Sequence, residues 1–317
     1  MTIQQAIREL TARLGPDRLI EHAPMDCYTS FQAGGAADLL VTPASEEELA
    51  AALAILEERG IPTLIMGNGS NLLVRDGGYR GAILRIGPAL GALATIEGGI
   101  SAGAGALLKE AAAFALAQGL SGLEFASGIP GSVGGAVFMN AGAYDGEIKA
   151  VVDAVRVLSR DGQRIDTLPV EAMDYGYRRS RLMENGGIVL SAAFRLEPQE
   201  QEAIAARMAD LSLRRKEKQP LDLPSAGSFF KRPPGHYAGQ LIEAAGLKGH
   251  RVGGAAVSEK HAGFLVNLGG ATASDILALM REVQEAVERT AGVRLEPEIR
   301  IVGDDPAGID GTAGSDN

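Results

Sequence analysis

The stretch of residues 124–146 constrains the fold of this chain more than any other. It reads EFASGIPGSVGGAVFMNAGAYDG, and from Phe125 to Tyr144 it carries no charged side chain. Its many glycines, with Pro130 and Asn140 among them, argue against a membrane-spanning helix. Glycine lets the main chain approach a ligand closely, and arrays of backbone N–H groups suit phosphate oxygens. The stretch therefore predicts either a backbone surface laid against a large ligand or a glycine-rich packing corner without one.

A second loop favours the ligand interpretation. Residues 64–74 read LIMGNGSNLLV, so the polar turn from Gly67 to Asn71 lies between two apolar runs. A polar loop between buried segments is a common place for a binding site. The dinucleotide fingerprint G-x-G-x-x-G fails here, because Leu72 occupies the position of the third glycine. A dinucleotide site in this chain would therefore have another design.

Composition and charge narrow the class of protein. A length of 317 residues allows about two domains, and the net charge of −10 argues against nucleic acid or an anionic membrane as a partner. Cys27 is the only cysteine and the four histidines lack the spacing of a metal site, so we expect no disulfide and no metal. The N-terminus lacks a signal-peptide pattern, and no apolar stripe is left over for self-association. These observations predict a cytoplasmic, monomeric enzyme.

Hydrophobic periodicity and turn residues divide the chain into helices and strands. A serine and three glutamates at 45–48 predict a capped helix, and the strands on either side of it, 38–42 and 61–66, predict a parallel β-α-β unit. Arg-Asp-Gly at 160–162 predicts a hairpin, and a change of composition near 197–200 predicts a domain boundary. The other expected helices are 3–14, 107–118, 199–218 and 272–292, and the other expected strands are 81–86, 95–102, 151–158, 163–167, 188–196, 255–267 and 294–302.

Three polar clusters lie in otherwise apolar or glycine-rich surroundings. The first comprises Tyr175, Tyr177, Arg178 and Arg181. It predicts either a solvated loop or a clamp for a carboxylate or phosphate, because arginine binds both groups through paired hydrogen bonds.

The other two clusters lie in the second half of the chain. Ser228, between a glycine and two phenylalanines, is either a turn residue or a proton-donating hydroxyl group. Glu298 lies in the terminal Glu-Pro-Glu segment and is either an edge-strand carboxylate paired with Arg300 or a general acid. Lys218 and Lys231 belong to a local basic patch that would suit a phosphate-bearing substrate.

Taken together, these motifs resemble the UDP-N-acetylenolpyruvoylglucosamine reductase (MurB) family of peptidoglycan precursor synthesis. The resemblance covers nearly all of residues 26–302. It is specific, because related flavoproteins share the glycine-rich half but not the motifs of the second half. The matching segments, in order, are TSFQAGGAADLL, MGNGSNLLV, SAGAG, GLSGLEFASGIPGSVGGAVFMNAGAYDGEI, GYRRSRL, AGSFFKRP, LIEAAGLKG, VSEKHAGFLVN and LEPEIR.

The resemblance implies an α+β fold with a two-lobed FAD-binding region of the PCMH/vanillyl-alcohol-oxidase type over residues 1–198. A C-terminal α/β substrate-binding domain would follow over 199–292, and a final strand, 293–302, would return to the first lobe before a disordered tail at 303–317. FAD would be bound non-covalently. The residues that match the flavin-contacting loops are Gly67, Asn68, Gly69, Ser70, Asn71, Gly128, Ile129, Pro130, Gly131, Ser132, Gly134, Gly135, Asn140, Ala141 and Gly142.

The resemblance also implies an NADPH-dependent reduction. Hydride from NADPH would reach, through the flavin, the terminal carbon of UDP-N-acetylglucosamine enolpyruvate and give UDP-N-acetylmuramate. Arg178 and Glu298 match residues that stabilise the enolate-like intermediate, and Ser228 matches the proton donor. Tyr177, Lys218 and Lys231 would contact the sugar or the phosphates of the substrate.

Two rival interpretations remain open. Another PCMH-type flavin oxidase or dehydrogenase would share the glycine loops without needing Arg178, Ser228 and Glu298 together. A non-catalytic nucleotide-sensing module would bind its ligand without flavin turnover, and Ser228→Ala would leave that binding unchanged.

Overall fold

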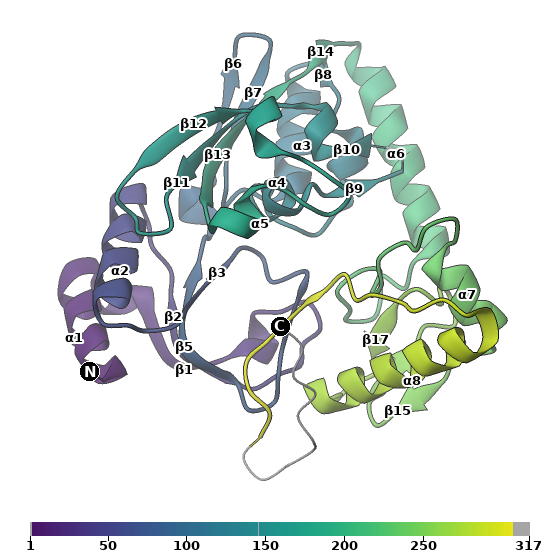
Figure 1. Ribbon diagram of the computed structural model, residues 1–317. Coiled ribbons are helices and arrows are strands. Elements are labelled where there is room, and N and C mark those ends of the chain that lie inside the picture. Colours follow the sequence, from purple (N-terminus) through teal and green to yellow (C-terminus); the bar gives the residue numbers. More distant parts are fainter. Residues whose placement is uncertain (1, 145, 307–317) are drawn as a thin grey trace. The chain divides into compact units, whose positions relative to one another are not determined.

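The computed structural model describes residues 2–144 and 146–306, which form two compact units of mixed helices and strands (Figure 1). The first unit comprises the residues up to Glu21, Leu39–Ser70 and Gly81–Leu221. The second comprises His22–Asp38, Asn71–Arg80 and the described residues from Asp222 onward. The second unit therefore contains segments from both halves of the chain.

The two N-terminal helices form where hydrophobic spacing and capping predict them. α1 (Ile3–Leu14) has the predicted bounds and buries its apolar face. α2 (Glu46–Glu58) follows Ser45, whose Oγ accepts the Glu48 N–H at 3.2 Å. The predicted helix cap is confirmed, because this bond satisfies one of the N–H groups that a helix start leaves unpaired.

A four-stranded sheet lies beside these helices, with the strand order β1-β2-β5-β3. β3 pairs in parallel with β5, so that Leu64 lies opposite Ile83. The prediction that the strands at 38–42 and 61–66 pair with each other is wrong, because β5 occupies the position between them. The four strands are β1 (Leu19–Pro24), β2 (Ala36–Val41), β3 (Thr63–Met66) and β5 (Tyr79–Arg85).

The larger sheet of the first unit is antiparallel, with the order β12-β11-β13-β7-β6. The predicted hairpin at 160–162 is confirmed, since Val155 pairs with Leu168 across it. The single strand predicted at 95–102 is instead a hairpin, because Gly98 adopts a φ of 72° and turns the chain. The five strands are β6 (Leu93–Ile96), β7 (Gly99–Gly103), β11 (Val152–Leu158), β12 (Ile165–Pro169) and β13 (Ile188–Arg195).

Helices cover this sheet and complete the core of the first unit. α3 (Leu108–Ala117) packs against β7, and α4 (Val133–Met139) packs against β7 and β13 (Figure 1). α4 lies inside the glycine-rich stretch, where the sequence predicted no helix. α6 (Gln201–Lys218) contacts α3, and the first unit ends at Leu221, whereas the sequence predicts a domain boundary at 198/199. The short elements of this unit are β8 (Leu120–Ser121), β9 (Gly142–Ala143), β10 (Gly146–Glu147), α5 (Leu182–Asn185) and β14 (Glu197–Pro198).

The second unit has its own core, to which residues 22–38 contribute. Phe31 is fully buried, and its ring centroid lies 6.0 Å from that of Phe229 in an edge-on arrangement. The side-chain amide of Asn267 donates to the Phe31 carbonyl at 3.0 Å. Residues 22–38, which we expected in the first domain, therefore belong to the second unit.

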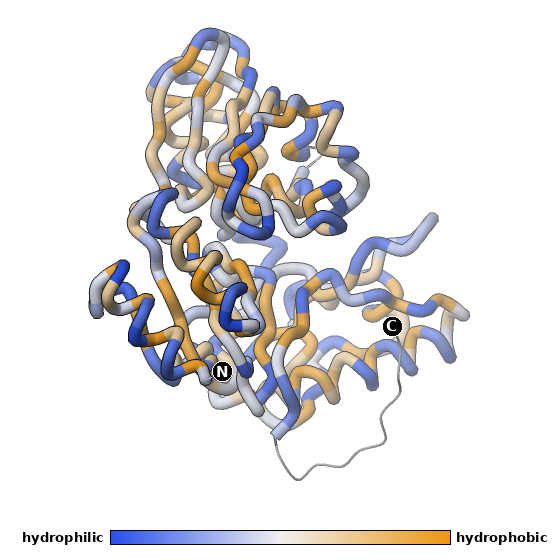
Figure 2. Tube along the Cα trace, turned by 60° about the vertical axis from the view of Figure 1, so that its left-hand side comes forward, coloured by the Kyte–Doolittle hydropathy of each residue, from blue (hydrophilic) through white to orange (hydrophobic). Residues whose placement is uncertain are grey.

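The C-terminal part of the second unit is built on one long amphipathic helix, α8 (Ala273–Ala291). Its buried residues recur every three or four positions, as the sequence predicts, and Figure 2 shows the hydrophobic and hydrophilic residues along the whole chain. The single strand expected at 255–267 is instead a pair, because the Ser258 Oγ accepts the N–H groups of Lys260 and His261 and turns the chain. The other elements here are α7 (Ala238–Ala244), β15 (Arg251–Val252), β16 (Ala255–Val257) and β17 (Leu265–Asn267).

The chain closes with a short strand. Of the strand predicted at 294–302, only β18 (Arg300–Val302) forms, and it pairs in parallel with β4 (Leu72–Val74). The Asp304 N–H donates to the Gly78 carbonyl at 2.9 Å, so the predicted tail does not begin at residue 303. The rest of that tail, from residue 307, lies outside the described residues.

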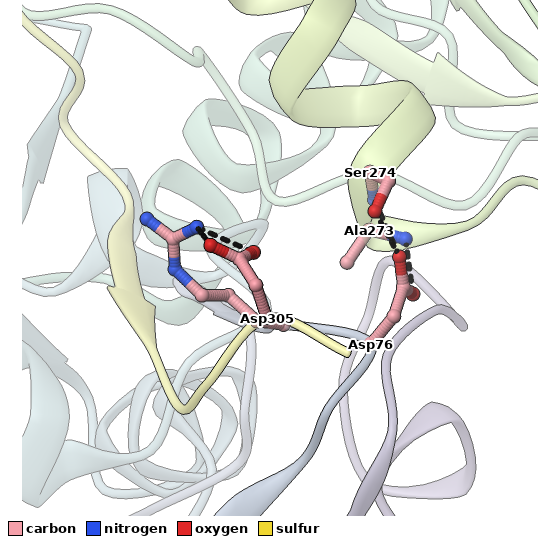
Figure 3. Close-up of polar contacts among 5 residues, drawn as sticks. Asp76, Ala273, Ser274 and Asp305 are labelled. Atoms are coloured by element: carbon pink, nitrogen blue, oxygen red, sulfur yellow. Dashed lines mark hydrogen bonds and ion pairs between the residues drawn. The ribbon is translucent and has the colours of Figure 1, made fainter. Parts of the chain in front are cut away.

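Asp76, in the turn that follows β4, holds the start of α8 (Figure 3). Its two carboxylate oxygens accept the N–H groups of Ala273 and Ser274, each at 2.8 Å, and the Ser274 hydroxyl also donates to it. Beside it, Asp305 pairs with Arg75 at 2.8 Å. An anion at a helix start satisfies unpaired N–H groups and interacts favourably with the helix dipole.

We expect Asp76→Ala to lower the free energy of unfolding by about 1–2 kcal/mol, because the first N–H groups of α8 lose their acceptor. Urea unfolding followed by circular dichroism at neutral pH measures this loss. Ser274→Ala is the matched control, since it removes only the hydroxyl bond and should cost less than about 1 kcal/mol. An Asp76→Ala protein with the wild-type urea midpoint would contradict the assignment.

Candidate functional site

Two glycine-rich loops of the first unit lie against each other. The side-chain amide of Asn68 donates to the Pro130 carbonyl at 2.7 Å. A Cβ atom at Gly67 would overlap the hydroxyl of Ser132, which is buried at the start of α4 and accepts the Gly135 N–H at 3.4 Å. The structure thus brings together residues 67–70 and 128–135, which the sequence separates by about sixty positions.

The second loop owes its shape to close packing of α4. A Cβ atom at Gly134 would lie 2.8 Å from the Cβ of Ala104, so only glycine allows this approach. Gly128 and Gly135, at either end of the loop, are both exposed. The loop therefore packs against the core at Gly134 and exposes its main chain at Gly128 and Gly135.

The end of α4 is held by a buried asparagine. Asn140 is fully buried and adopts a φ of 49°, the left-handed conformation typical of a residue that ends a helix. Its side-chain amide donates to a Glu147 carboxylate oxygen at 2.8 Å and to the Gly176 carbonyl at 3.0 Å, and its Oδ1 accepts the Lys149 N–H at 2.9 Å. The side chain of Asn140, which was predicted to contact the cofactor, thus makes three hydrogen bonds within the protein.

Arg178 lies beside the end of α4. Its guanidinium donates to the Gly142 carbonyl at 3.2 Å and to the Asn140 carbonyl at 3.5 Å. The same guanidinium lies 5.0 Å from the ring centroid of Tyr177, which is 54% exposed. Arg178 has a φ of 53°, a conformation that costs a non-glycine residue about 1–3 kcal/mol and that clusters at functional sites.

Tyr175 carries the one buried side-chain N or O atom, within residues 2–144 and 146–306, that lacks a hydrogen-bond partner. Burial raises the pKa of this hydroxyl well above its ordinary value, so it remains a neutral donor. A buried hydroxyl without a partner is costly, and such groups commonly mark a place for a ligand or water.

Arg215 is a residue of this site that the sequence analysis missed. It is only 9% exposed, donates to the Gly128 carbonyl, and lies 5.6 Å from the ring centroid of Tyr144. Burial lowers the pKa of its guanidinium. Helical spacing was the available signal, because Arg215 follows Leu211 by four positions on the buried face of α6. Lys218, at the end of the same helix, is exposed.

In the second unit, the segments of Ser228 and Glu298 pair with each other. The Glu298 N–H donates to the carbonyl of Phe229 at 2.8 Å, and Phe230 forms an antiparallel bridge with Pro297. Ser228 is exposed next to this pairing. Ser228 and Glu298, predicted to act in the same reaction, are far apart in the sequence. The fold places them on paired segments.

Two other predicted residues of the second unit have partners of a different kind from those expected. Asn71, predicted to contact the cofactor, donates its side-chain amide to the Glu298 carbonyl at 3.2 Å. Lys231, predicted to contact the substrate, forms an ion pair with Glu296 at 3.2 Å. The predicted catalytic residues are therefore divided, with Arg178 in the first unit and Ser228 and Glu298 in the second.

Two further properties concern ligands and membranes. No group of three histidine, cysteine, aspartate or glutamate side chains in the described part of the chain could hold a metal ion. None of the described helices combines the length and apolar character needed to cross a bilayer.

Comparison with known proteins covers both units. Residues 37–168 match the family described as FAD binding domain, and residues 219–302 match the family described as UDP-N-acetylenolpyruvoylglucosamine reductase, C-terminal domain.

Relatives extend over almost the whole chain. A UDP-N-acetylenolpyruvoylglucosamine reductase from Clostridium botulinum (strain Alaska E43 / Type E3) is 48% identical over 94% of this chain and 98% of its own. One from Levilactobacillus brevis is 49% identical over 91% of this chain and 94% of its own. The crystal structure of the corresponding reductase (MurB) from Thermus caldophilus superposes with a TM-score of 0.77 at 39% identity, covering 89% of this chain and 97% of that one. The chain therefore belongs to the UDP-N-acetylenolpyruvoylglucosamine reductase family, and it is an FAD-dependent oxidoreductase of α+β fold.

Proposed function

We propose that this protein reduces UDP-N-acetylglucosamine enolpyruvate to UDP-N-acetylmuramate with NADPH, in the cytoplasmic synthesis of peptidoglycan precursors. The observation that carries the proposal is the 48% identity to a reductase of that name along both units. A flavin oxidase that shared only the glycine loops would not need the paired Ser228 and Glu298 segments of the second unit.

The residues present fit FAD. The loops at 67–70 and 128–135 meet through backbone and small side chains, which leaves main-chain groups open to a large flat ligand. The Tyr175 hydroxyl provides a buried donor that lacks a partner among the described residues. We propose that these loops, with Ala141 and Gly142, hold the cofactor. Bound FAD would supply the two-electron chemistry by which hydride passes from NADPH to the enolpyruvyl group.

We assign the stabilisation of negative charge to Arg178 and Glu298. Hydride addition to the terminal carbon builds negative charge on the neighbouring carbon and its carboxylate. A preorganised donor aimed at such charge typically contributes about 3–4 kcal/mol. Arg178 carries the positive charge for this role, and its fixed contacts with the carbonyls of Asn140 and Gly142 keep it in place. Glu298, in the protonated form, would donate a hydrogen bond to the same carboxylate.

Ser228 is the proposed proton donor to the neighbouring carbon. A serine hydroxyl is a weak acid, so a nearby group must assist it. Glu298 is the candidate, because the Glu298 N–H is bound to the residue that follows Ser228. The proposed contacts to the phosphates or sugar of the substrate are Tyr177 and Lys218, which are exposed, and Lys231, which pairs with Glu296 at the surface.

The visible spectrum of the purified protein under anaerobic conditions tests the proposed function. We expect a yellow protein that bleaches with NADPH and regains its colour with UDP-N-acetylglucosamine enolpyruvate. Bleaching without recovery would retain the flavin but assign another electron acceptor. A colourless protein that cannot be loaded with FAD would overturn the proposal.

The contact between the two glycine loops gives a test of the cofactor site alone. Gly67→Ala should weaken FAD affinity by about tenfold or more, because overpacking against Ser132 costs about 1–3 kcal/mol. Gly67→Ala/Ser132→Ala should recover most of that affinity, since the overlapping hydroxyl is gone and the new Cβ would lie 3.4 Å from the Cβ of residue 132. Absorbance titration of the apoprotein with FAD measures both values. Ser132→Ala alone is the control, and wild-type affinity in Gly67→Ala would contradict the assignment.

A further inference from the structure

Two hydrogen bonds join the end of α4 to the segment that carries Arg178. On one side of Arg178, the Asn140 amide donates to the Gly176 carbonyl at 3.0 Å. On the other side, the hydroxyl of fully buried Ser180 donates to the carbonyl of Phe138. Arg178, with its strained φ of 53°, therefore lies between two hydrogen bonds that join its segment to the end of α4.

Asn140 has no amide hydrogen left for a cofactor. A side-chain amide has two N–H donors, and those of Asn140 go to Glu147 and Gly176. Its oxygen accepts the Lys149 N–H, and the whole residue is buried. A direct cofactor contact through this side chain would require breaking one of these bonds in the interior, where an unsatisfied polar group is costly.

From these contacts we propose that Asn140 is a positioning residue for Arg178 rather than a contact to the cofactor. Its amide sets the path of the chain at Gly176, and its carbonyl, with that of Gly142, receives the Arg178 guanidinium. The proposal rests on the function proposed above, in which Arg178 faces the charge that develops on the substrate. Displacing such a group by about 1 Å can cost a hundredfold in rate.

A charge-neutral swap isolates the contact with Gly176. In Asn140→Asp/Glu147→Gln, the bond between positions 140 and 147 persists with the donor reversed, and the net charge of the pair is unchanged. The oxygen that accepts the Lys149 N–H is also kept. The bond to the Gly176 carbonyl is lost, because an oxygen replaces the donating nitrogen and faces that carbonyl. Glu147→Gln alone is the control for the loss of the Glu147 ion pair with Lys149.

We expect kcat of the swapped pair to fall by about 10–100-fold, with KM within about threefold of the wild-type value. FAD affinity of the apoprotein should stay at the value of Glu147→Gln, while the melting temperature should fall below that of Glu147→Gln, because a hydrogen bond of a buried residue is lost. Wild-type kcat in the swapped pair would overturn the proposal. It would equally be overturned by weakened FAD affinity together with a kcat that saturating FAD restores, since that result assigns Asn140 to the cofactor.

If Asn140→Asp/Glu147→Gln does not fold, the hydrogen bond from Ser180 to Phe138 provides a second test of the proposal. Ser180→Ala removes the bond to Phe138 without adding charge, and we expect the same fall in kcat with unchanged FAD affinity. Wild-type kcat in that variant would overturn the proposal. Failure of the proposed function itself is distinguishable, because the wild-type protein would then show no turnover with the enolpyruvyl sugar.

Discussion

Close approach of backbone segments at Gly67 and Ser132 is the constraint on which the candidate cofactor site depends. The absence of a side chain at position 67 lets the loop after β3 lie directly on the start of α4, and the Asn68 bond to Pro130 fixes the two loops together. Gly134 allows α4 itself to sit on Ala104. The packing interpretation of the glycine-rich stretch is thus confirmed at Gly134, and the ligand interpretation belongs to the cofactor site proposed above.

Each of the two units holds its own predicted catalytic residues in place. In the first unit, carbonyl oxygens at the end of α4 accept hydrogen bonds from Arg178, and the hydrogen bonds of Gly176 and Ser180 hold the chain on either side of it. In the second, the segment of Glu298 is held on its N–H side by Phe229 and on its carbonyl side by Asn71. Glu298 is thus held through its own backbone, whereas Arg178 is held through its guanidinium as well as through its segment.

Features set by local sequence could be predicted, and features set by distant contacts could not. The bounds of α1 and the cap of α2 follow from spacing and capping alone. Residues 22–38 belong to the second unit because Phe31 packs against Phe229, which lies about two hundred positions later in the chain. In the same way, the motifs identified Asn71 and Asn140 as residues of the site, but only the fold shows that their amides bind the segments of Glu298 and Arg178. Arg215 was missed because it lies in a charged run, where an arginine is ordinarily exposed, although helical spacing places it on the same face as Leu211.

The proposed reaction depends on Ser228 as the proton donor. Stopped-flow spectroscopy of Ser228→Ala tests this role by measuring the rates of flavin reduction and reoxidation. Flavin reduction by NADPH and reoxidation by UDP-N-acetylglucosamine enolpyruvate are followed separately under anaerobic conditions, with Ser225→Ala as a control in the same loop. If Ser228 donates the proton, reoxidation slows by about 10²–10⁴-fold, the usual contribution of a general acid, while reduction by NADPH keeps its wild-type rate. Reoxidation slowed by less than about tenfold, or an equal loss in both steps, would contradict it.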